Sequence, residues 1–330
     1  MLKLLLAEFE HPADGPFYAE RLRAVAPDLD IVTADTPAAA VALAAGAQIL
    51  VAKAHSVSPA LAAAMPDLRW IQALTTGVDA LDSLALAPEI MITSMRGIHG
   101  PQMSELAMLL MLALQRQFPR LLRHQATKTW QRWPQPLLAG RTVLLVGLGV
   151  IAEMIAVRCA AFDMRITGVS DGRTEAPGFA AVYPRARLAE AAAEADFVIV
   201  LVPASDATHN LIDETVLRAM APHSFLINIA RGRVVDEAAL IRALNDGWIA
   251  GAALDVFARE PLPADYPLWT APNLIITPHI GGLSDAYADQ VLPTLVHNVA
   301  AYVEGRLGDM RNRVRSTGNV LSVSTTHDIS

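Results

Sequence analysis

Short β-branched runs alternate with alanine-rich helical segments along most of the chain, and this alternation limits the possible folds more than any other feature. In the first 100 residues, helical stretches such as 16–26 and 36–45 separate the candidate strands. The candidate strands are 2–7, 30–33, 48–52, 69–73 and 90–93. Strands that alternate with helices pair in parallel, because each helix returns the chain across the sheet. This region therefore predicts an open parallel sheet.

A second alternation starts at residue 141 and ends at His279. Its candidate strands are 142–147, 165–169, 196–202, 224–229, 250–255 and 274–277. Between the two sets, residues 101–125 predict one long amphipathic helix that starts at a proline, followed by an irregular arm over 130–136. Residues 284–305 are again helical, and the polar tail from Arg311 shows no periodicity, so we expect it to be poorly ordered.

Charge and cysteine content exclude several classes of protein. A net charge of −7 leaves no basic field for a phosphate backbone, so we expect no nucleic-acid partner. Cys159 is the only cysteine, which excludes an intrachain disulfide and a multi-thiolate metal site. We predict no metal and a reduced, cytoplasmic setting. The N-terminus reads as a buried strand, and the chain has no uncharged apolar run of about 18 residues, so we expect no membrane association.

Residues 143–152 read as a strand that enters a dinucleotide-binding turn. Gly147 permits a tight turn, and Gly149 lets the backbone approach a pyrophosphate. The helix that follows directs its first amides, near Val150 and Ile151, toward the phosphates. The third small position of the motif is Ala152, which suffices for helix-strand packing.

The next candidate strand ends near two residues with opposite implications for the cofactor. Asp171 lies 19 residues beyond Ala152, where a carboxylate accepts hydrogen bonds from the ribose hydroxyls of NAD. Arg173 could instead bind the 2′-phosphate of NADP. Both cofactors stay open, and the spacing slightly favours NAD.

Three stretches in the C-terminal third each place one polar residue after an apolar run. They end at Arg231, Glu260 and His279. A guanidinium clamps a carboxylate in bidentate fashion, an imidazole moves a proton, and a carboxylate holds the imidazole. Together with the nucleotide turn, this set predicts hydride transfer to or from a 2-oxo or 2-hydroxy acid.

Two further strand ends carry candidate residues. The loop Thr75-Thr76-Gly77 follows a predicted strand, and the amides of Thr76 and Gly77 could cradle a substrate carboxylate. Lys53 also ends a strand and could face the same cleft, although a solvated lysine is the favoured interpretation.

These motifs together resemble the D-isomer-specific 2-hydroxyacid dehydrogenases of the glyoxylate/hydroxypyruvate reductase type, over residues 45–305. The Gly-x-Gly-x-x-Ala turn, Asn-Ile-Ala-Arg-Gly, Glu-Pro-Leu-Pro and Thr-Pro-His-Ile-Gly-Gly stand in the family's order and at its intervals. The resemblance implies that Arg231 binds the substrate carboxylate and carbonyl, His279 exchanges the proton, and Glu260 partners the histidine. It also implies cofactor contacts from Pro203, Ala230, Asp255 and Met103. The family's usual ribose-binding aspartate aligns with Ser170 and not with Asp171.

The implied architecture is α/β, with two doubly wound parallel-sheet domains. We expect a Rossmann nucleotide domain over residues 101–281, and a flavodoxin-like substrate domain made of residues 1–100 and 282–330. A cleft between the two would exclude water on closure. The apolar surface of the long helix and of the tryptophan-containing arm predicts a homodimer.

Two alternative functions compete with this one. One is a dinucleotide-sensing, corepressor-like binding protein without significant turnover. The other is a formate- or phosphite-type dehydrogenase of the same fold. The presence of Arg231, Glu260 and His279 together favours an enzyme that acts on 2-oxo acids.

Overall fold

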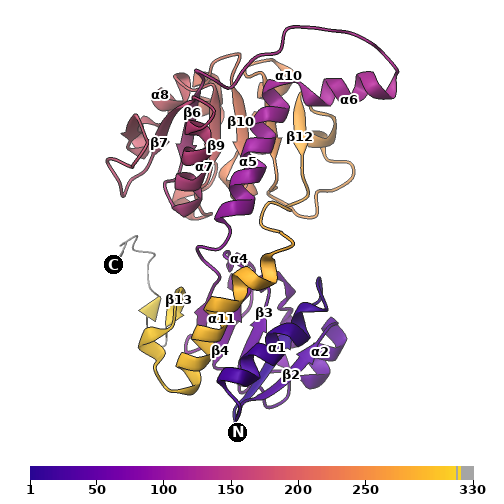
Figure 1. Cartoon of the computed structure of the whole chain (residues 1–330), viewed down its shortest axis with the longest axis vertical. Helices are drawn as coiled ribbons and strands as arrows, with labels where there is room; N and C mark the ends of the chain where they lie inside the picture. The colour runs from indigo at the N-terminus through magenta and orange to yellow at the C-terminus, as the bar shows by residue number, and fades with distance from the viewer. Residues whose placement is uncertain (317–318, 321–330) are drawn as a thin grey trace. The chain divides into compact units, whose positions relative to one another are not determined.

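The chain divides into two compact units in a computed structural model that describes residues 1–316 and 319–320. One unit comprises Met1–Ile98 with Ser284–Ser330, and the other comprises His99–Leu283. Each contains a seven-stranded sheet with helices on both faces (Figure 1). None of the described helices is long and apolar enough to cross a membrane.

The sheet of the first unit has the order β14-β13-β5-β4-β3-β1-β2. Its strands are β1 (Lys3–Ala7), β2 (Asp30–Ala34), β3 (Ile49–Ala52), β4 (Trp70–Ala73), β5 (Met91–Thr93), β13 (Arg313–Ser316) and β14 (Asn319–Val320). Strands β1 to β5 are parallel, in the 2-1-3-4-5 order of a flavodoxin-like fold. The predicted fold of this unit is therefore confirmed.

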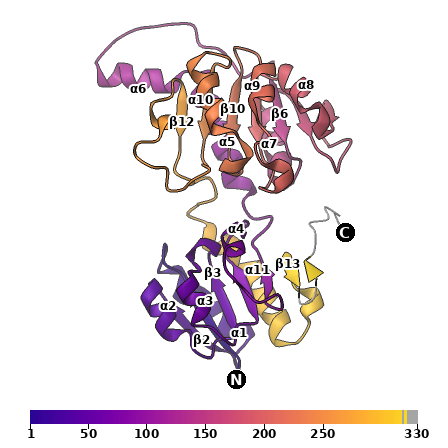
Figure 2. The ribbon, with the colours of Figure 1, turned by 180° about the vertical axis from the view of Figure 1, so that it is seen from behind.

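Successive residues of β1 face opposite layers of helices, as the period of two in a strand requires. Leu4 and Leu6 pack with α1 (Asp14–Val25) and α11 (Tyr287–Val303). Leu5 and Ala7 pack on the other face, which is turned toward the viewer in Figure 2. The helices there are α2 (Pro37–Leu43), α3 (Pro59–Ala63) and α4 (Asp79–Asp82).

The sheet of the second unit is parallel throughout, in the order β12-β11-β10-β9-β6-β7-β8. Its strands are β6 (Thr142–Val146), β7 (Arg165–Val169), β8 (Ala181–Tyr183), β9 (Phe197–Val200), β10 (Phe225–Asn228), β11 (Gly251–Leu254) and β12 (Leu274–Ile276). Counted from β6, this is the 3-2-1-4-5-6 order of a dinucleotide-binding fold with one more strand beyond it. The Rossmann prediction is confirmed.

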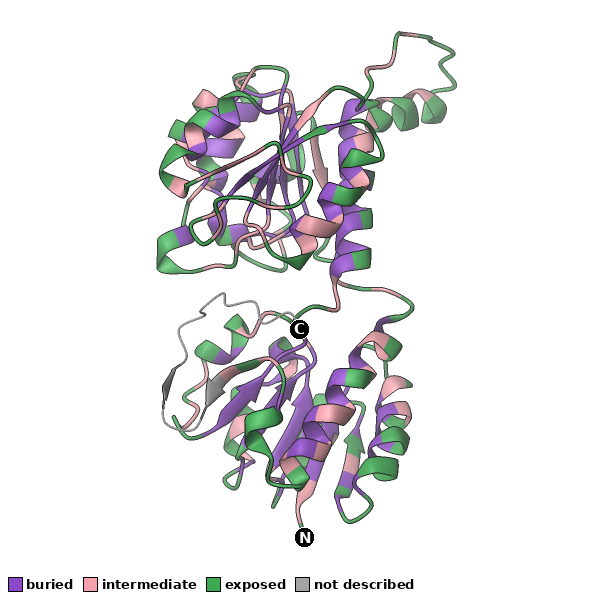
Figure 3. Ribbon diagram, turned by 60° about the vertical axis from the view of Figure 1, so that its left-hand side comes forward, coloured by how far each residue is buried: buried purple, intermediate pink, exposed green. Residues whose placement is uncertain are grey.

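The helices of the second unit also form two layers. Val143 and Leu145 of β6 pack with α5 and α7, whereas Leu144 and Val146 pack with α8, α9 and α10. The helices are α5 (Gly100–Gln115), α6 (Phe118–Ala126), α7 (Val150–Ala160), α8 (Leu188–Ala193), α9 (Glu214–Ala219) and α10 (Glu237–Asn245). Helix α6 joins neither layer, and none of its residues is buried (Figure 3).

The single helix expected over residues 101–125 is wrong, because the structure contains two helices there. Helix α5 ends at Gln115, and Gln117 adopts a left-handed backbone conformation with a φ of 52°. Pro119 follows in the first turn of α6. A proline fits a first helical turn but not a helix interior, since it has no N–H to donate.

Two other elements differ from the sequence-based expectation. Strand β8 is not predicted, because it is only three residues long and half-buried. The polar tail is ordered at its start, since β13 pairs antiparallel with β5, so the expectation of disorder from Arg311 is wrong there. Residues 317–318 and 321–330 of that tail lie outside the described residues.

Candidate active site

The candidate residues of the second unit follow the carboxyl ends of its parallel strands. These strand-end residues are Gly147 after β6, Ser170 after β7, Pro203 after β9, Ala230 after β10, Asp255 after β11 and His279 after β12. Parallel strands end at the same edge of a sheet, so these residues share one edge. The strand order reverses between β6 and β9, and open α/β sheets bind their ligands at such a point.

The turn between β6 and α7 leaves room for a ligand. Gly147 has a φ of 103°, and a Cβ there would lie 2.8 Å from Val202 Cγ1. Apart from Gly149 itself and its two neighbours in the chain, no heavy atom of the described residues would lie within 4 Å of a Cβ on Gly149. Among the described residues, no side chain caps the N-terminus of α7. Val150 is exposed there and Ile151 is half-buried. This geometry fits a pyrophosphate at the helix N-terminus.

Side chains beyond β7 form two ion pairs. The Asp171 carboxylate accepts bonds from Arg185, at 2.6 Å from Nη2 and 3.1 Å from the backbone N. Arg173 Nη1 lies 2.6 Å from Glu153 Oε1. The Ser170 hydroxyl accepts the Arg173 backbone N–H at 3.1 Å. Two guanidinium groups therefore lie close to the residue that ends the strand.

Asn228 shapes the turn that carries Arg231. Its buried side chain donates from Nδ2 to the Arg231 carbonyl at 2.9 Å and accepts the Ala230 N–H at 3.1 Å. Arg231 donates from Nη1 to the Ala230 carbonyl at 2.7 Å. The sequence predicts no role for Asn228, although an asparagine at the end of a strand can bond the backbone of the turn that follows.

The Arg231 turn packs closely against the loop that carries Glu260. A Cβ on Gly232 would lie 1.8 Å from the carbonyl carbon of Phe257 and 2.2 Å from the Ala258 nitrogen. Only glycine permits this approach of two backbones. The position of Arg231 relative to Glu260 is therefore set by main-chain packing.

Asp255 fixes the loop that carries His279. This carboxylate is buried, and its Oδ1 accepts the Thr277 hydroxyl at 2.6 Å and the Ile280 N–H at 3.0 Å. Its Oδ2 accepts the Gly281 N–H at 2.9 Å. The family resemblance implies only a cofactor contact for Asp255, and its role in fixing this loop is not predicted from the sequence.

His279 has a strained backbone and a charged partner. Its φ is 52°, a conformation that costs about 1–3 kcal/mol for a residue other than glycine. Its N–H donates to the Asp255 carbonyl at 2.8 Å, and its ring Nδ1 lies 2.6 Å from Glu260 Oε2. Met103 of α5 lies against the same loop, with its sulfur 3.1 Å from where a Gly281 Cβ would stand.

The pair of His279 and Glu260 shifts both titrations toward the charged forms. The hydrogen bond to Glu260 raises the pKa of His279, and the Glu260 and Asp255 charges add to this effect against burial and the Arg231 charge. Burial opposes ionisation of Glu260, but the bonds from His279 and the Phe257 N–H, with the charges of His279 and Arg231, hold its pKa below the ordinary value. The structure thus brings Arg231, Glu260 and His279 within electrostatic range of one another.

Thr76 and Gly77 belong to the first unit, where they form part of the loop after β4. The Thr76 hydroxyl donates to the Met95 carbonyl at 2.8 Å, and the Thr75 hydroxyl donates to the Gly77 carbonyl at 2.7 Å. These two bonds fix the conformation of the loop.

Lys53, in the same unit, is not the solvated lysine that the sequence favoured. Its side chain is buried, and Nζ lies 3.2 Å from Glu8 Oε1 and 2.7 Å from Glu10 Oε2. A buried ammonium needs such partners, because desolvation penalises an unpaired charge.

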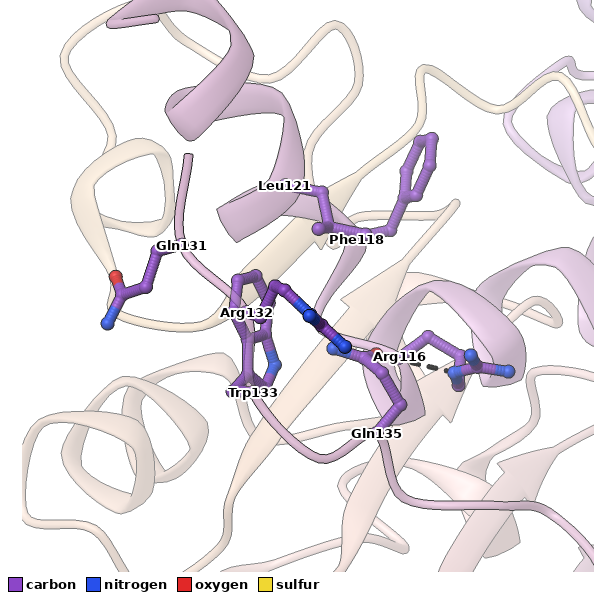
Figure 4. A pocket seen from close by; sticks show the side chains of 7 residues that line it. All are labelled: Arg116, Phe118, Leu121, Gln131, Arg132, Trp133 and Gln135. Atoms are coloured by element: carbon purple, nitrogen blue, oxygen red, sulfur yellow. Dashed lines mark hydrogen bonds between the residues drawn. The ribbon is translucent and has the colours of Figure 1, made fainter. Parts of the chain in front are cut away.

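A cavity of about 450 Å³ lies between α6 and the arm that follows it, and none of the catalytic candidates lines it. Phe118 and Leu121 of α6 line one part of it (Figure 4). The other lining residues are Arg116, Gln131, Arg132, Trp133 and Gln135. Its apolar and cationic lining differs from the strand-end site described above.

Comparisons with known proteins agree with this geometry. Residues 108–281 match the family model "D-isomer specific 2-hydroxyacid dehydrogenase, NAD binding domain". A glyoxylate reductase of Korarchaeum cryptofilum is 33% identical over 254 residues, which cover 74% of this chain and 76% of that protein. The structure of a D-isomer specific 2-hydroxyacid dehydrogenase family protein from Aeromonas salmonicida matches with a TM-score of 0.86 and 36% identity, covering 95% of this chain and 99% of that one. An NADPH-dependent glyoxylate/hydroxypyruvate reductase from Sinorhizobium meliloti, solved with NADP and sulfate, matches with a TM-score of 0.81 and 25% identity, covering 95% and 98%.

Proposed function

The chain belongs to the D-isomer specific 2-hydroxyacid dehydrogenase family, and from that membership we propose which of its residues carry the reaction. The chain is an NAD(P)-dependent oxidoreductase for a small 2-oxo acid or the corresponding D-2-hydroxy acid. The observation that carries the proposal for the site is the 2.6 Å contact between His279 Nδ1 and Glu260 Oε2, within the electrostatic range of Arg231. A corepressor-like protein without turnover has no need of this set.

Arg231 holds the substrate, which we take to be a small 2-oxo acid such as glyoxylate or hydroxypyruvate. A guanidinium forms paired hydrogen bonds to a carboxylate, and its remaining N–H groups polarise the C2 carbonyl. The bond from Asn228 Nδ2 to the Arg231 carbonyl fixes the backbone from which this side chain extends. That the amides of Thr76 and Gly77 in the first unit bind the substrate carboxylate stays a prediction.

His279 donates the proton to the C2 oxygen in the reductive direction. Because Nδ1 is bonded to Glu260, Nε2 is the nitrogen left to exchange a proton with the substrate. Glu260 stabilises the imidazolium and orients the ring. In the oxidative direction the neutral ring accepts the proton from the hydroxyl group.

The second unit provides the dinucleotide site in this proposal, and the first unit provides the substrate domain. When bound, NAD(P)H supplies the hydride. Gly147, Gly149 and the first amides of α7, at Val150 and Ile151, would hold its pyrophosphate. Pro203 and Ala230 would contact the cofactor, Asp255 would face the nicotinamide amide, and Met103 would pack near the nicotinamide.

The test is a panel of 2-oxo acids assayed with NADH and with NADPH, in which the change in nicotinamide absorbance measures turnover. We expect turnover with small 2-oxo acids and formation of the D-isomer wherever the product is chiral, as it is for hydroxypyruvate but not for glyoxylate. The absence of turnover with every acid, despite measurable dinucleotide binding, would favour the dinucleotide-sensing alternative.

Glu260→Gln should move the pH profile of reduction to lower pH. The Glu260 hydrogen bond and charge raise the pKa of His279, so their loss lowers that pKa and the acid form disappears at a lower pH. The measurement is kcat against pH for the native and variant enzymes. A displacement of the alkaline limb toward higher pH would contradict the pairing.

The residues beyond β7 support NADPH as the preferred cofactor, against the spacing argument for NAD. The Asp171 carboxylate is bonded to Arg185, and Arg173 beside Ser170 can receive a 2′-phosphate by exchanging its ion pair with Glu153. Arg173→Ala should lower kcat/KM for NADPH about tenfold or more, the usual loss for a hydrogen bond between charged groups, and change that for NADH little. Arg187→Ala is the control, because Arg187 pairs with Glu190 on the surface. A native preference for NADH would refute the assignment.

We infer that the chain is a two-fold homodimer through α6 and the arm that follows. Phe118 and Leu122 are 49% and 51% exposed and lie one turn apart on α6, and Trp130 is 93% exposed. Exposed apolar surface of this extent, adjoining the cavity of Figure 4, fits a self-complementary interface.

Sedimentation velocity at micromolar concentration should show a species of twice 35.3 kDa. Leu122→Glu should dissociate it, since the substitution replaces an apolar contact of the interface with a charge that must be desolvated. Val157→Glu on α7, at a residue 71% exposed, should leave the dimer intact. A native protein that sediments only as the monomer contradicts the inference.

A further inference from the structure

One buried carboxylate binds both sides of the loop that carries Glu260. Glu237 is the first residue of α10 and is only 8% exposed. Its Oε1 accepts the Ala258 N–H at 2.7 Å, and its Oε2 accepts the Tyr266 hydroxyl at 2.7 Å. Ala258 precedes Glu260 in the chain and Tyr266 follows it, so Glu237 closes the segment 258–266 from within.

The catalytic contact of Glu260 depends on where this segment lies. Glu260 Oε1 accepts the Phe257 N–H at 2.8 Å, which leaves Oε2 for His279 Nδ1. The backbone on the amino side of Glu260 is packed against Gly232, whereas the carboxyl side reaches α10 through Tyr266. A segment held at one side only could move Oε2 away from the imidazole.

The two bonds of Glu237 suit a permanent clamp. A carboxylate is stable in a buried position only when hydrogen-bond donors compensate its desolvation, and both of its oxygens have one. The hydrogen bond to Glu237, with burial, raises the pKa of Tyr266 to about 12, so the phenol stays a donor throughout the working range of pH.

We propose that Glu237 is a positioning residue, which keeps Glu260 Oε2 against His279 Nδ1 by fixing the 258–266 segment at both sides. The proposal rests on the function proposed above for the Glu260–His279 pair. Glu237 acts through Glu260 and touches neither substrate nor cofactor.

The test is the titration of the His279 ring, followed by NMR in Glu237→Ala, Glu237→Gln and Tyr266→Phe enzymes, together with kcat and the KM for NAD(P)H. Glu260→Gln provides the reference shift. Glu214→Ala is the matched control, because Glu214 follows an aspartate N-cap at the start of α9 as Glu237 does at α10.

We expect Glu237→Ala to lower the pKa of His279 in the same direction as Glu260→Gln and to reduce kcat about tenfold, with the KM for NAD(P)H unchanged. Glu237→Gln keeps an acceptor for the Ala258 N–H, and Tyr266→Phe keeps the bond from Glu237 to Ala258. Both variants should therefore lower the pKa of His279 less than Glu237→Ala does. Adding Glu237→Ala to Glu260→Gln should give no further shift, because both act through one contact.

The proposal is overturned if Glu260→Gln moves the His279 titration while Glu237→Ala lowers only the melting temperature. Glu237 would then be structural, and the catalytic pair would stand. If Glu260→Gln leaves the titration unchanged, the pair itself fails, and with it the proposed function of the site. Should Glu237→Ala not fold, Glu237→Gln and Tyr266→Phe carry the same comparison.

Discussion

His279→Asn should lower kcat for reduction of the preferred 2-oxo acid by about 10²- to 10⁴-fold, the contribution of a positioned general acid. The effect is large because Nε2 is the proton donor in the proposed site and no amide replaces it. Asparagine is the informative substitution, since it tolerates the left-handed φ of 52° at this residue. The fold and the bonds of Asp255 to the loop should therefore survive.

The measurement is steady-state kinetics at several pH values, with the binding of NAD(P)H titrated separately. Cofactor affinity should stay near that of the native enzyme, and the pH dependence that comes from His279 should vanish. His297→Asn is the control, because the ring of His297 bonds the Asp309 carbonyl in the first unit and has no role in the proposed reaction. A His279→Asn enzyme with native turnover would remove the histidine from the mechanism.

The part of the site that the sequence predicts is local. The strand-end residues of the second unit come shortly after apolar runs, and a parallel sheet brings the ends of such runs to one edge. The strand boundaries follow from the same runs, within one or two residues at most ends. The break at Gln117 also has a local signal, since Pro119 marks the start of a new helix.

The part that the sequence does not predict depends on partners far apart in the chain. Glu237 meets Ala258 and Tyr266 across 21 and 29 residues, and Asp255 meets Thr277 across 22. The buried ammonium of Lys53 is compensated by Glu10, whose carboxylate lies 2.7 Å away although the two residues are 43 positions apart in the sequence. No periodicity or spacing in the sequence predicts these hydrogen bonds and ion pairs, because they depend on which strands and loops are neighbours in the folded sheet.

Arg231→Ala should reduce kcat/KM for the 2-oxo acid by about 10²- to 10³-fold, with a higher KM for the acid and a lower kcat. The guanidinium contacts the substrate in both the ground state and the transition state, so both constants change. The KM for NAD(P)H should stay nearly constant. Arg231→Lys should recover little, because an ammonium keeps the charge but not the planar fork.

The pH profile distinguishes this prediction from a general loss of structure. The Glu260 bond raises the pKa of His279, whereas the Arg231 charge lowers it. Removing Arg231 should therefore move the alkaline limb of reduction to higher pH, opposite to the shift expected for Glu260→Gln. Arg233→Ala is the control from the same turn, since its side chain is exposed. If Arg231→Ala leaves the KM for the acid unchanged, or lowers the pKa of His279, Arg231 is not the substrate clamp and the anion must be bound elsewhere.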